Sequence, residues 1–228
     1  MQDFVGIVIQ KKNLTSSVVE LSVRVTDPGF TYVPGQFVQF RIGQASRAYS
    51  ISSWPEEEVG VLSFVIGLVE DGVGSNFMRG LRAGEQVTVS QAAGRFTAQD
   101  VHGPVCLIAN GVGVAPLRGI IGGLLQHGFT SPITLMCGYH DQGDILYPDF
   151  FDGLDELYLN FDVEYCLSQP KTGWKGFTGR VTKNLYNNLE KFAHHTFFIC
   201  GSKDMVADSR SILLKAKTPM AAIRLEIF

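Results

Sequence analysis

The segment 46–55, SRAYSISSWP, places a cation, a phenol and several hydroxyls on one expected strand. Because side chains alternate between the two faces of a strand, Arg47 and Tyr49 share one face. Ala48 and Ser50 share the other. A guanidinium fork suits a phosphate, a phenol offers a flat apolar face with a polar tip, and a short hydroxyl can reach the edge of a ring. A plain half-buried strand would alternate apolar and polar residues, so this strand carries more polar chemistry than packing requires.

A glycine-rich turn in the second half of the chain, within IANGVGVAPLRGI, could bind an anion. Gly111 and Gly113 follow an apolar run, and Pro116 stands where a helix can begin its first turn. Glycines at such a place let the backbone approach a phosphate closely, and the free amides of the helix start favour an anion. The same pattern also occurs as an ordinary tight turn, so this segment alone leaves both interpretations open.

A second glycine-rich turn lies in the first half of the chain, within EDGVGSNFMRGL. Gly72 and Gly74 precede Ser75, which we expect to cap a short helix over residues 76–81 and to leave the amides of Asn76 and Phe77 facing a ligand. A capped helix without a ligand is the alternative. The presence of two possible anion-binding turns, one in each half of the chain, favours a bound ligand over two ordinary turns.

The composition excludes several classes of partner. The 228 residues contain 19 Lys and Arg against 22 Asp and Glu, a formal charge of -3, so no basic face for nucleic acid or an anionic membrane is expected. No run approaches the roughly 18 apolar residues of a membrane span, and the start, MQDFVGIVIQKKN, lacks the pattern of a secretory signal. We therefore expect a cytoplasmic protein.

The cysteines indicate buried thiols rather than a metal site. They stand about 30 residues apart, without the close pairs that a zinc or iron-sulfur site requires. A free cysteine is most often simply buried, so we expect no metal. The four are Cys106, Cys137, Cys166 and Cys200.

The pattern of elements changes near residue 100, which predicts two domains, residues 1–100 and 101–228. Before the change, short β-rich segments separated by turn formers predict an antiparallel barrel. After it, near-continuous apolar runs alternate with helix-like stretches, which predicts a parallel five-stranded sheet covered on both faces, with its ligand at the carboxyl ends of the strands. The expected strands are 5–10, 17–25, 35–42, 47–52, 60–69 and 85–91, then 105–110, 133–139, 161–168, 196–202 and 221–228.

Taken together, these motifs resemble the ferredoxin-NADP reductase superfamily. The arginine, tyrosine and serines of residues 47–53 are similar to its RxYSxxS flavin signature. The resemblance continues, in family order, through 72–75, 111–116, 200–201 and 226–228. It implies a Greek-key FAD-binding barrel followed by a Rossmann-like NAD(P)-binding domain, and an enzyme that moves hydride from NAD(P)H to FAD.

The resemblance implies a role for each residue on the flavin side. Arg47 would bind the FAD pyrophosphate, Tyr49 would pack against one face of the isoalloxazine, and Ser50 would lie near its N5. Ser75 would hold the same pyrophosphate from the helix start, and Gly94 would border the FAD unless it only makes a turn. Other implied FAD contacts are Ala48, Ser53, Gly72, Gly74 and Asn76.

The resemblance likewise implies roles on the nicotinamide side. The loop with Gly111, Val112, Gly113 and Pro116 would bind the coenzyme pyrophosphate, close to Gly201. The residues around the hydride transfer would be Ser50, Cys200 and Glu226, with the thiol bordering the nicotinamide and the carboxylate relaying a proton or balancing charge. Phe228 would stack on the flavin and move aside for the nicotinamide. Alternatives are a solvated carboxylate for Glu226 and a core aromatic for Phe228.

The expected coenzyme is NADH. Plant-like members of the superfamily bind the 2′-phosphate of NADPH with a Ser-Arg pair, whereas this chain has Ser168 and Gln169 there, and an amide cannot supply a charge-assisted fork. Asp141 suits a ribose diol better than a phosphate. NADPH remains an alternative, because Lys171, Lys175 and Arg180 are near enough to bind a 2′-phosphate.

The electron acceptor is expected to be a separate small redox protein, such as a ferredoxin or flavodoxin, or an oxygenase component. Free flavin as the acceptor is one alternative, and an electron-transfer subunit of a larger complex is another. A flavin-bearing sensor without turnover is a further possibility.

Overall fold

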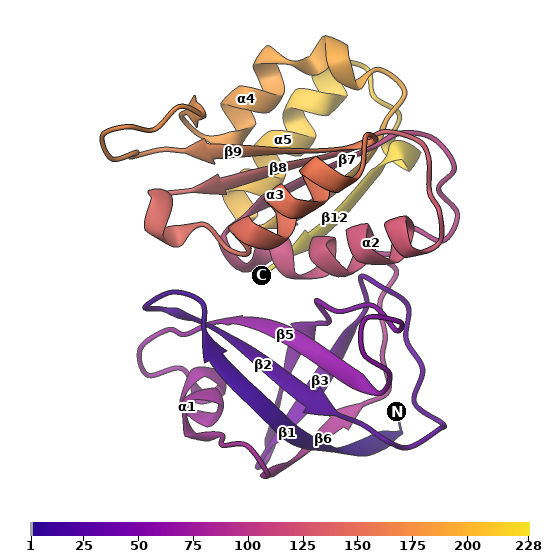
Figure 1. Ribbon diagram of the computed structural model, residues 1–228, viewed down its shortest axis with the longest axis vertical. Helices are drawn as coiled ribbons and strands as arrows, with labels where there is room; N and C mark the ends of the chain where they lie inside the picture. The colour runs from indigo at the N-terminus through magenta and orange to yellow at the C-terminus, as the bar shows by residue number, and fades with distance from the viewer. Residues whose placement is uncertain (1) are drawn as a thin grey trace. The chain divides into compact units, whose positions relative to one another are not determined.

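The computed structural model describes residues 2–228 and divides the chain into two compact units (Figure 1). Unit 1 comprises Met1–Ala98 and Arg118–Gly128, and unit 2 comprises Gln99–Leu117 and Phe129–Phe228. The second segment of unit 1 lies inside what the sequence pattern assigns to the second domain. Within residues 2–228, no helix is both long and apolar enough to cross a membrane.

Unit 1 is an antiparallel barrel, as the turn-separated β segments predict. Its six strands are arranged in the order β4-β3-β6-β1-β2-β5, so that β6 lies between β1 and β3. The sheet closes where Ile51, just after β4, forms a bridge with Phe64 of β5. The elements are β1 (Asp3–Asn13), β2 (Val18–Arg24), β3 (Phe37–Ile42), β4 (Ala45–Ser50), β5 (Val61–Gly67), α1 (Val73–Gly80) and β6 (Gln86–Ser90).

The interior of unit 1 follows from the alternation along its strands. In β2 and in the first six residues of β1 every second residue is buried, which is the pattern of strands with one wet face. Phe40 and Phe64 meet edge to face with ring centroids 5.0 Å apart, and Tyr49 also packs edge to face with Phe40. The aromatic core therefore reaches the strand that carries the candidate ligand residues.

Unit 2 is a parallel sheet in the order β10-β9-β8-β7-β11-β12. The five predicted strands are present, and the structure adds a sixth, β10, whose two residues at the sheet edge are too short to leave a pattern in the sequence. The strands are β7 (Val105–Asn110), β8 (Ile133–Tyr139), β9 (Phe161–Leu167), β10 (Phe177–Thr178), β11 (Thr196–Gly201) and β12 (Ile223–Ile227). The helices are α2 (Val114–Gln126), α3 (Pro148–Leu157), α4 (Val181–Asn187) and α5 (Lys203–Lys215).

Helices cover both faces of this sheet, as expected for buried parallel strands (Figure 1). Tyr165 of β9 donates a hydrogen bond to Asp152 of α3 (2.9 Å), whereas its neighbour Glu164 accepts one from Asn184 of α4 (2.5 Å). Because neighbouring residues of a strand point to opposite faces, α3 and α4 lie on opposite sides of the sheet.

Helix α2 begins in unit 2, but from Arg118 onward its residues belong to unit 1. Arg118 is 7% exposed, donates to the Ser52 carbonyl (2.9 Å), pairs with the Glu57 carboxylate, and lies over the Trp54 ring. A Cβ built on Gly122 would overlap the same indole, so the glycine is what lets the helix approach the barrel this closely.

Candidate functional site

Strand β4 carries the candidate ligand residues of unit 1. Arg47 is exposed and Tyr49 is partly buried beside it on the same face, while Ser50 points the other way and is 4% exposed. The Tyr49 ring packs edge to face on Phe40, with centroids 5.5 Å apart. Burial raises the pKa of Tyr49, so its hydroxyl remains a hydrogen-bond donor at neutral pH.

The first turn of helix α1 lies directly beside this pair. A Cβ built on Gly74 would be 2.5 Å from the Tyr49 hydroxyl oxygen and 3.3 Å from Cγ of Arg47. Only glycine fits there, because any side chain would displace the phenol. The structure thus brings together two motifs that are about 25 residues apart in the sequence, counting from Tyr49 to Gly74.

The predicted start of this helix is wrong. The helix begins at Val73, after Gly72, and Ser75 does not cap it, because its hydroxyl accepts the Val69 amide instead (3.0 Å). The Asn76 amide bonds to the Gly72 carbonyl (2.8 Å) and therefore cannot face a ligand. The amides without an intrahelical partner belong to the first helical residues, Val73, Gly74 and Ser75.

Two other residues predicted on the flavin side lie farther along the barrel. The Ser53 hydroxyl accepts the Ser63 amide (3.0 Å) and lies 3.2 Å from the Tyr32 hydroxyl, so its visible role is to join strand ends. Gly94 has a left-handed φ of +111° and packs on Phe37, the β3 residue paired with Ser50.

The strand order of unit 2 locates the candidate site of that unit. From β7 the chain winds outward through β8, β9 and β10, then returns to the other side of β7 for β11 and β12. The direction of winding therefore reverses between β7 and β11. In open parallel sheets, ligands bind outside the carboxyl ends of the strands at this reversal.

The predicted Gly111–Pro116 loop lies at this reversal. Gly111 adopts a φ of +53°, and a Cβ on Gly113 would overlap the carbonyl group of Cys200 at the end of β11. Pro116 is in the first turn of α2, where it costs no helical hydrogen bond. The loop thus lies tightly against β11.

Asn110 is a functional candidate that the sequence reading missed. Its side-chain oxygen accepts the Ser202 amide (2.8 Å), and its side-chain nitrogen donates to the Ser202 hydroxyl (3.0 Å), which fastens the ends of β7 and β11 together. A Cβ on Gly201 would overlap this asparagine oxygen. An asparagine that ends an apolar strand just before the glycines was the available signal.

Cys200 and Glu226 are side by side. In the parallel register, Cys200 pairs with Ala109 of β7 and with Glu226 of β12, so the three side chains share one face of the sheet. Burial, with a smaller effect of Glu226, raises the pKa of the Cys200 thiol well above its ordinary value. The thiol is protonated at neutral pH and is no nucleophile. Phe228 donates its amide to the Gly201 carbonyl (3.2 Å), and the residue is 52% exposed.

The four buried thiols predict a loss of stability at high pH. Burial raises the pKa of each one, that of Cys166 to about 12. The unfolded chain releases these protons at lower pH than the folded protein does, so the free energy of unfolding should fall above about pH 9, by up to about 1.4 kcal/mol per pH unit for each thiol. Urea unfolding between pH 8 and about 10.5 measures the slope. Cys166→Ala should make this slope shallower by nearly the contribution of one proton, about 1.4 kcal/mol per pH unit. An unchanged slope would contradict the raised pKa of the Cys166 thiol.

The residues predicted to read the coenzyme ribose also gather at the carboxyl ends of strands. The amides of Ser168 and Gln169, after β9, donate to the carbonyls of Tyr139 (3.1 Å) and His140 (2.8 Å), at the end of β8. Asp141 follows immediately. Its carboxylate is bonded to Lys171 (2.8 Å), a partner that the sequence alone did not reveal.

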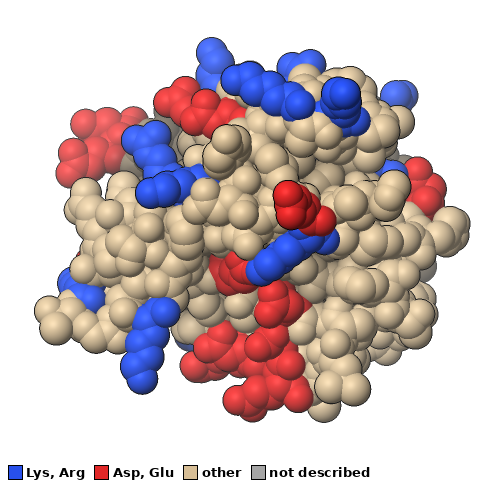
Figure 2. All heavy atoms as spheres, turned by 90° about the horizontal axis from the view of Figure 1, so that it is seen from above, with Lys and Arg blue, Asp and Glu red and all other residues tan. Residues whose placement is uncertain are grey.

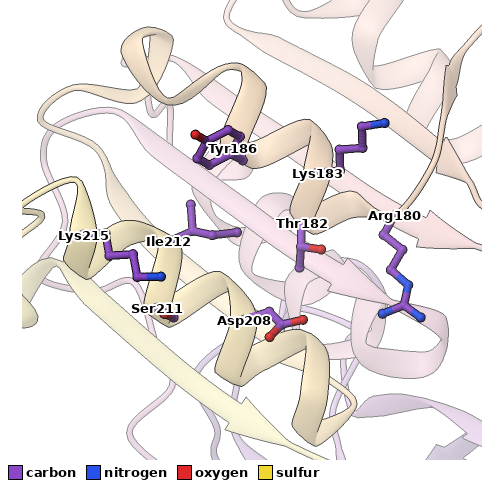
Figure 3. Close-up of a pocket in the computed structure, with 8 residues that line it drawn as sticks. All are labelled: Arg180, Thr182, Lys183, Tyr186, Asp208, Ser211, Ile212 and Lys215. Carbon is purple, nitrogen blue, oxygen red and sulfur yellow. The ribbon is translucent and has the colours of Figure 1, made fainter.

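An open groove of about 450 Å³ lies elsewhere in unit 2, between α4 and α5 (Figure 3). Among the residues lining it, only Arg180 is one that the sequence indicated for coenzyme binding. They are Arg180, Thr182, Lys183, Tyr186, Asp208, Ser211, Ile212 and Lys215. The face of the molecule in Figure 2 carries both acidic and basic side chains rather than one continuous basic surface. Among residues 2–228, no group of three potential ligands could hold a metal ion.

Comparisons with known proteins identify a domain type in each half of the chain. The family model of the oxidoreductase FAD-binding domain matches residues 6–98, and that of the oxidoreductase NAD-binding domain matches residues 107–211. Between them the two matches leave out only 1–5, 99–106 and 212–228.

Two relatives illustrate the range of similar proteins. The chain is 25% identical over 199 residues to the toluate 1,2-dioxygenase electron transfer component of Pseudomonas putida, covering 86% of this chain and 58% of that protein. It is 30% identical over 203 residues to one of the subunits of the Na(+)-translocating NADH-quinone reductase of Methylococcus capsulatus, covering 81% of this chain and 49% of that relative. The chain thus spans about half the length of these curated relatives.

Solved structures show the same fold. A cytochrome P450 reductase from Amycolatopsis superposes with a TM-score of 0.90 at 22% identity, covering 100% of this chain and 70% of that one. The ferredoxin-NADP+ reductase of Plasmodium falciparum superposes with a TM-score of 0.84 at 21% identity, covering 100% and 97%. With domain matches over nearly the whole sequence, the chain belongs to the ferredoxin-reductase-like family of FAD- and NAD-binding oxidoreductases.

Proposed function

We propose that this chain holds FAD on unit 1, binds a reduced nicotinamide coenzyme on unit 2, and passes electrons from that coenzyme to a separate acceptor. The observation that carries the proposal is the cradle of Arg47, Tyr49 and Gly74, in which a cation, an aromatic face and free helix amides meet where no side chain would fit. These are the groups that a flavin dinucleotide needs from a protein.

On unit 1 the chain's task is to hold and orient the cofactor. The exposed Arg47 guanidinium suits one side of a pyrophosphate, and the amides of Val73, Gly74 and Ser75 suit the other, because the helix start favours an anion. Tyr49, braced on Phe40, offers its ring to the isoalloxazine, and Ser50 lies on the same strand for the ring edge. When bound, FAD supplies the chemistry: it accepts two electrons as hydride and releases them singly or in pairs.

On unit 2 the chain's task is to hold the coenzyme pyrophosphate and to shape the place where the nicotinamide binds. The Gly111–Pro116 loop presents backbone amides, and Asn110 keeps β7 and β11 together beneath them. Cys200, protonated and buried, would border the nicotinamide without reacting. Glu226, beside it, can hold a proton or balance charge.

We propose NADH as the preferred coenzyme. Gln169 stands where a guanidinium would be needed to grip a 2′-phosphate, and the Asp141 carboxylate repels such a phosphate. Lys171 is the nearest cation, but it is already bonded to Asp141. A ribose diol, in contrast, can donate hydrogen bonds to a carboxylate.

For the acceptor we propose an oxygenase component or another small redox protein. The relative in Pseudomonas putida is named as the electron transfer component of a dioxygenase, which favours this partner. A second candidate function is that of an electron-transfer subunit in a larger complex, because several relatives are subunits of Na(+)-translocating NADH-quinone reductases.

Anaerobic mixing tests the proposal. Adding NADH to the purified yellow protein should bleach the flavin absorbance rapidly, and NADPH should need a concentration about tenfold higher because its 2′-phosphate meets Asp141. The measurement is stopped-flow absorbance at the flavin maximum. Protein that stays colourless after reconstitution with FAD, or flavin that neither coenzyme reduces, would refute the function.

A further inference from the structure

The turns after β8 and β9 are fastened together by three bonds that converge on one residue, Lys171. Asp141 Oδ2 lies 2.8 Å from Lys171 Nζ. The Gln142 side chain accepts the Lys171 amide (2.8 Å) and donates to the Lys171 carbonyl (3.1 Å). Both the main chain and the cation of Lys171 are therefore held from the opposite turn.

The carboxylate that holds the cation is itself fixed in direction. Asp141 Oδ1 accepts the Gly143 amide (2.6 Å), and the Asp141 amide donates to Asp144 Oδ2 (3.2 Å), which together form a reciprocal capping box. The bond to Lys171 lowers the pKa of Asp141 and raises that of Lys171, so both partners are charged. The carboxylate that pairs with Lys171 is thus held in one orientation by the hydrogen bonds of its own turn.

The pair stands among the residues expected to read the ribose. Ser168 and Gln169 are three and two residues before Lys171, and their amides bond to the carbonyls of Tyr139 and His140 at the end of β8. The Ser168 hydroxyl also lies 3.3 Å from His140 Nδ1. These three residues and the ion pair therefore lie together at the carboxyl ends of β8 and β9.

We propose that Asp141 sets coenzyme choice by pairing with Lys171, so that the charge of the lysine is not available to a 2′-phosphate. This ion pair then determines the coenzyme specificity of the site. A coenzyme with a 2′-phosphate needs a cation at that place, and here the cation is already neutralised and accompanied by a fixed negative charge. A coenzyme with a free diol needs no cation. Specificity of this kind comes from repelling the wrong ligand as well as from attracting the right one. The inference rests on the proposed binding of a nicotinamide coenzyme at this edge.

An ordinary surface ion pair would behave differently. The two side chains are 69% and 29% exposed, and exposed pairs contribute little to stability. If the pair only joined two turns, its removal would change the stability slightly and would not change the discrimination between a 2′-phosphate and a diol.

The experiment measures binding of 2′-AMP and 5′-AMP to the FAD-loaded chain by calorimetry. In Asp141→Asn, the amide oxygen can still accept the Gly143 amide, so the turn is kept while the carboxylate charge is lost. We expect 2′-AMP to bind at least about tenfold more tightly to this variant, and 5′-AMP to change by less than about threefold. Adding Lys171→Met to Asp141→Asn should cancel the gain.

Asp144→Asn is the matched control, since it removes one negative charge from the same turn but leaves the ion pair. Its 2′-AMP affinity should change far less than that of Asp141→Asn. Lys171→Met alone, with Asp141 intact, should weaken 2′-AMP further and spare 5′-AMP, which supplies a second variant if the first folds poorly. An unchanged 2′-AMP affinity in Asp141→Asn, or a gain that survives Lys171→Met, would overturn the inference. If the wild-type chain binds neither nucleotide, the proposed function itself fails.

Discussion

Arg47→Ala should purify with little or no FAD. Arg47 is exposed, with its Cγ beside Gly74, and the only hydrogen bond of its guanidinium found within the described residues is to the neighbouring Ser46 carbonyl (2.8 Å), which leaves donors for a phosphate. Hydrogen bonds to charged groups contribute about 1.5–3 kcal/mol each, so losing one or two of them should weaken FAD about 10- to 100-fold or more. The ratio of flavin to protein absorbance, followed by titration with FAD, measures the loss.

Two further variants make this result specific. Arg47→Lys keeps the charge but loses the planar fork, and it should bind FAD with intermediate affinity. Arg41→Ala removes an arginine from the neighbouring strand β3, where it is paired with Asp3 (2.7 Å), and it should keep its flavin. Full flavin occupancy in Arg47→Ala would show that the cradle does not depend on the cation.

Gly113→Ala should destabilise unit 2 by about 3 kcal/mol, because an added methyl group would overlap the Cys200 carbonyl and approach Gly201 Cα to 2.8 Å. These atoms are backbone of a central strand, which cannot rotate aside as a flexible side chain would. The loop would have to move away from β11, and the backbone amides that we propose bind the coenzyme would move with it. Coenzyme binding should therefore weaken together with stability.

The two tryptophans allow unit 2 to be followed alone. Trp54 belongs to unit 1 and Trp174 to unit 2, so in a Trp54→Phe background the tryptophan fluorescence reports only the second unit. Urea midpoints then compare Gly113→Ala with Gly153→Ala as the control. Gly153 lies inside α3 with open space around it, so alanine there should stabilise by about 0.5–1 kcal/mol. Equal midpoints for the two variants would rule out the tight approach at Gly113.

Much of the architecture could be predicted from local pattern. The alternation in the first half and the continuous apolar runs in the second correctly indicate an antiparallel barrel and a parallel sheet, because both patterns follow from which strand faces are buried. Strand β10 could not be predicted, since two residues carry no period. The predicted start of α1 is wrong because Ser75 has the chemistry of a cap, yet its hydroxyl is used by Val69.

The site was less accessible to sequence reasoning, because its partners are distant in the chain. The contact of Gly74 with Tyr49 and the bonds of Asn110 to Ser202 join segments whose closeness depends on the fold. The pairing of Asp141 with Lys171 changes what each residue offers a ligand, although the sequence already indicated each one separately. Residue types indicate which groups could bind a ligand, whereas contacts in the folded protein decide which of those groups are still available to bind it.

The path of helix α2 has a consequence for dissecting the protein. A fragment cut at residue 100 would end before Arg118–Gly128, which belong to unit 1. It would expose the indole that Gly122 approaches and leave the Glu57 carboxylate without its guanidinium. The flavin-binding half is therefore not an excisable N-terminal module, and chimaeras that exchange it between relatives would need to carry the helix with it.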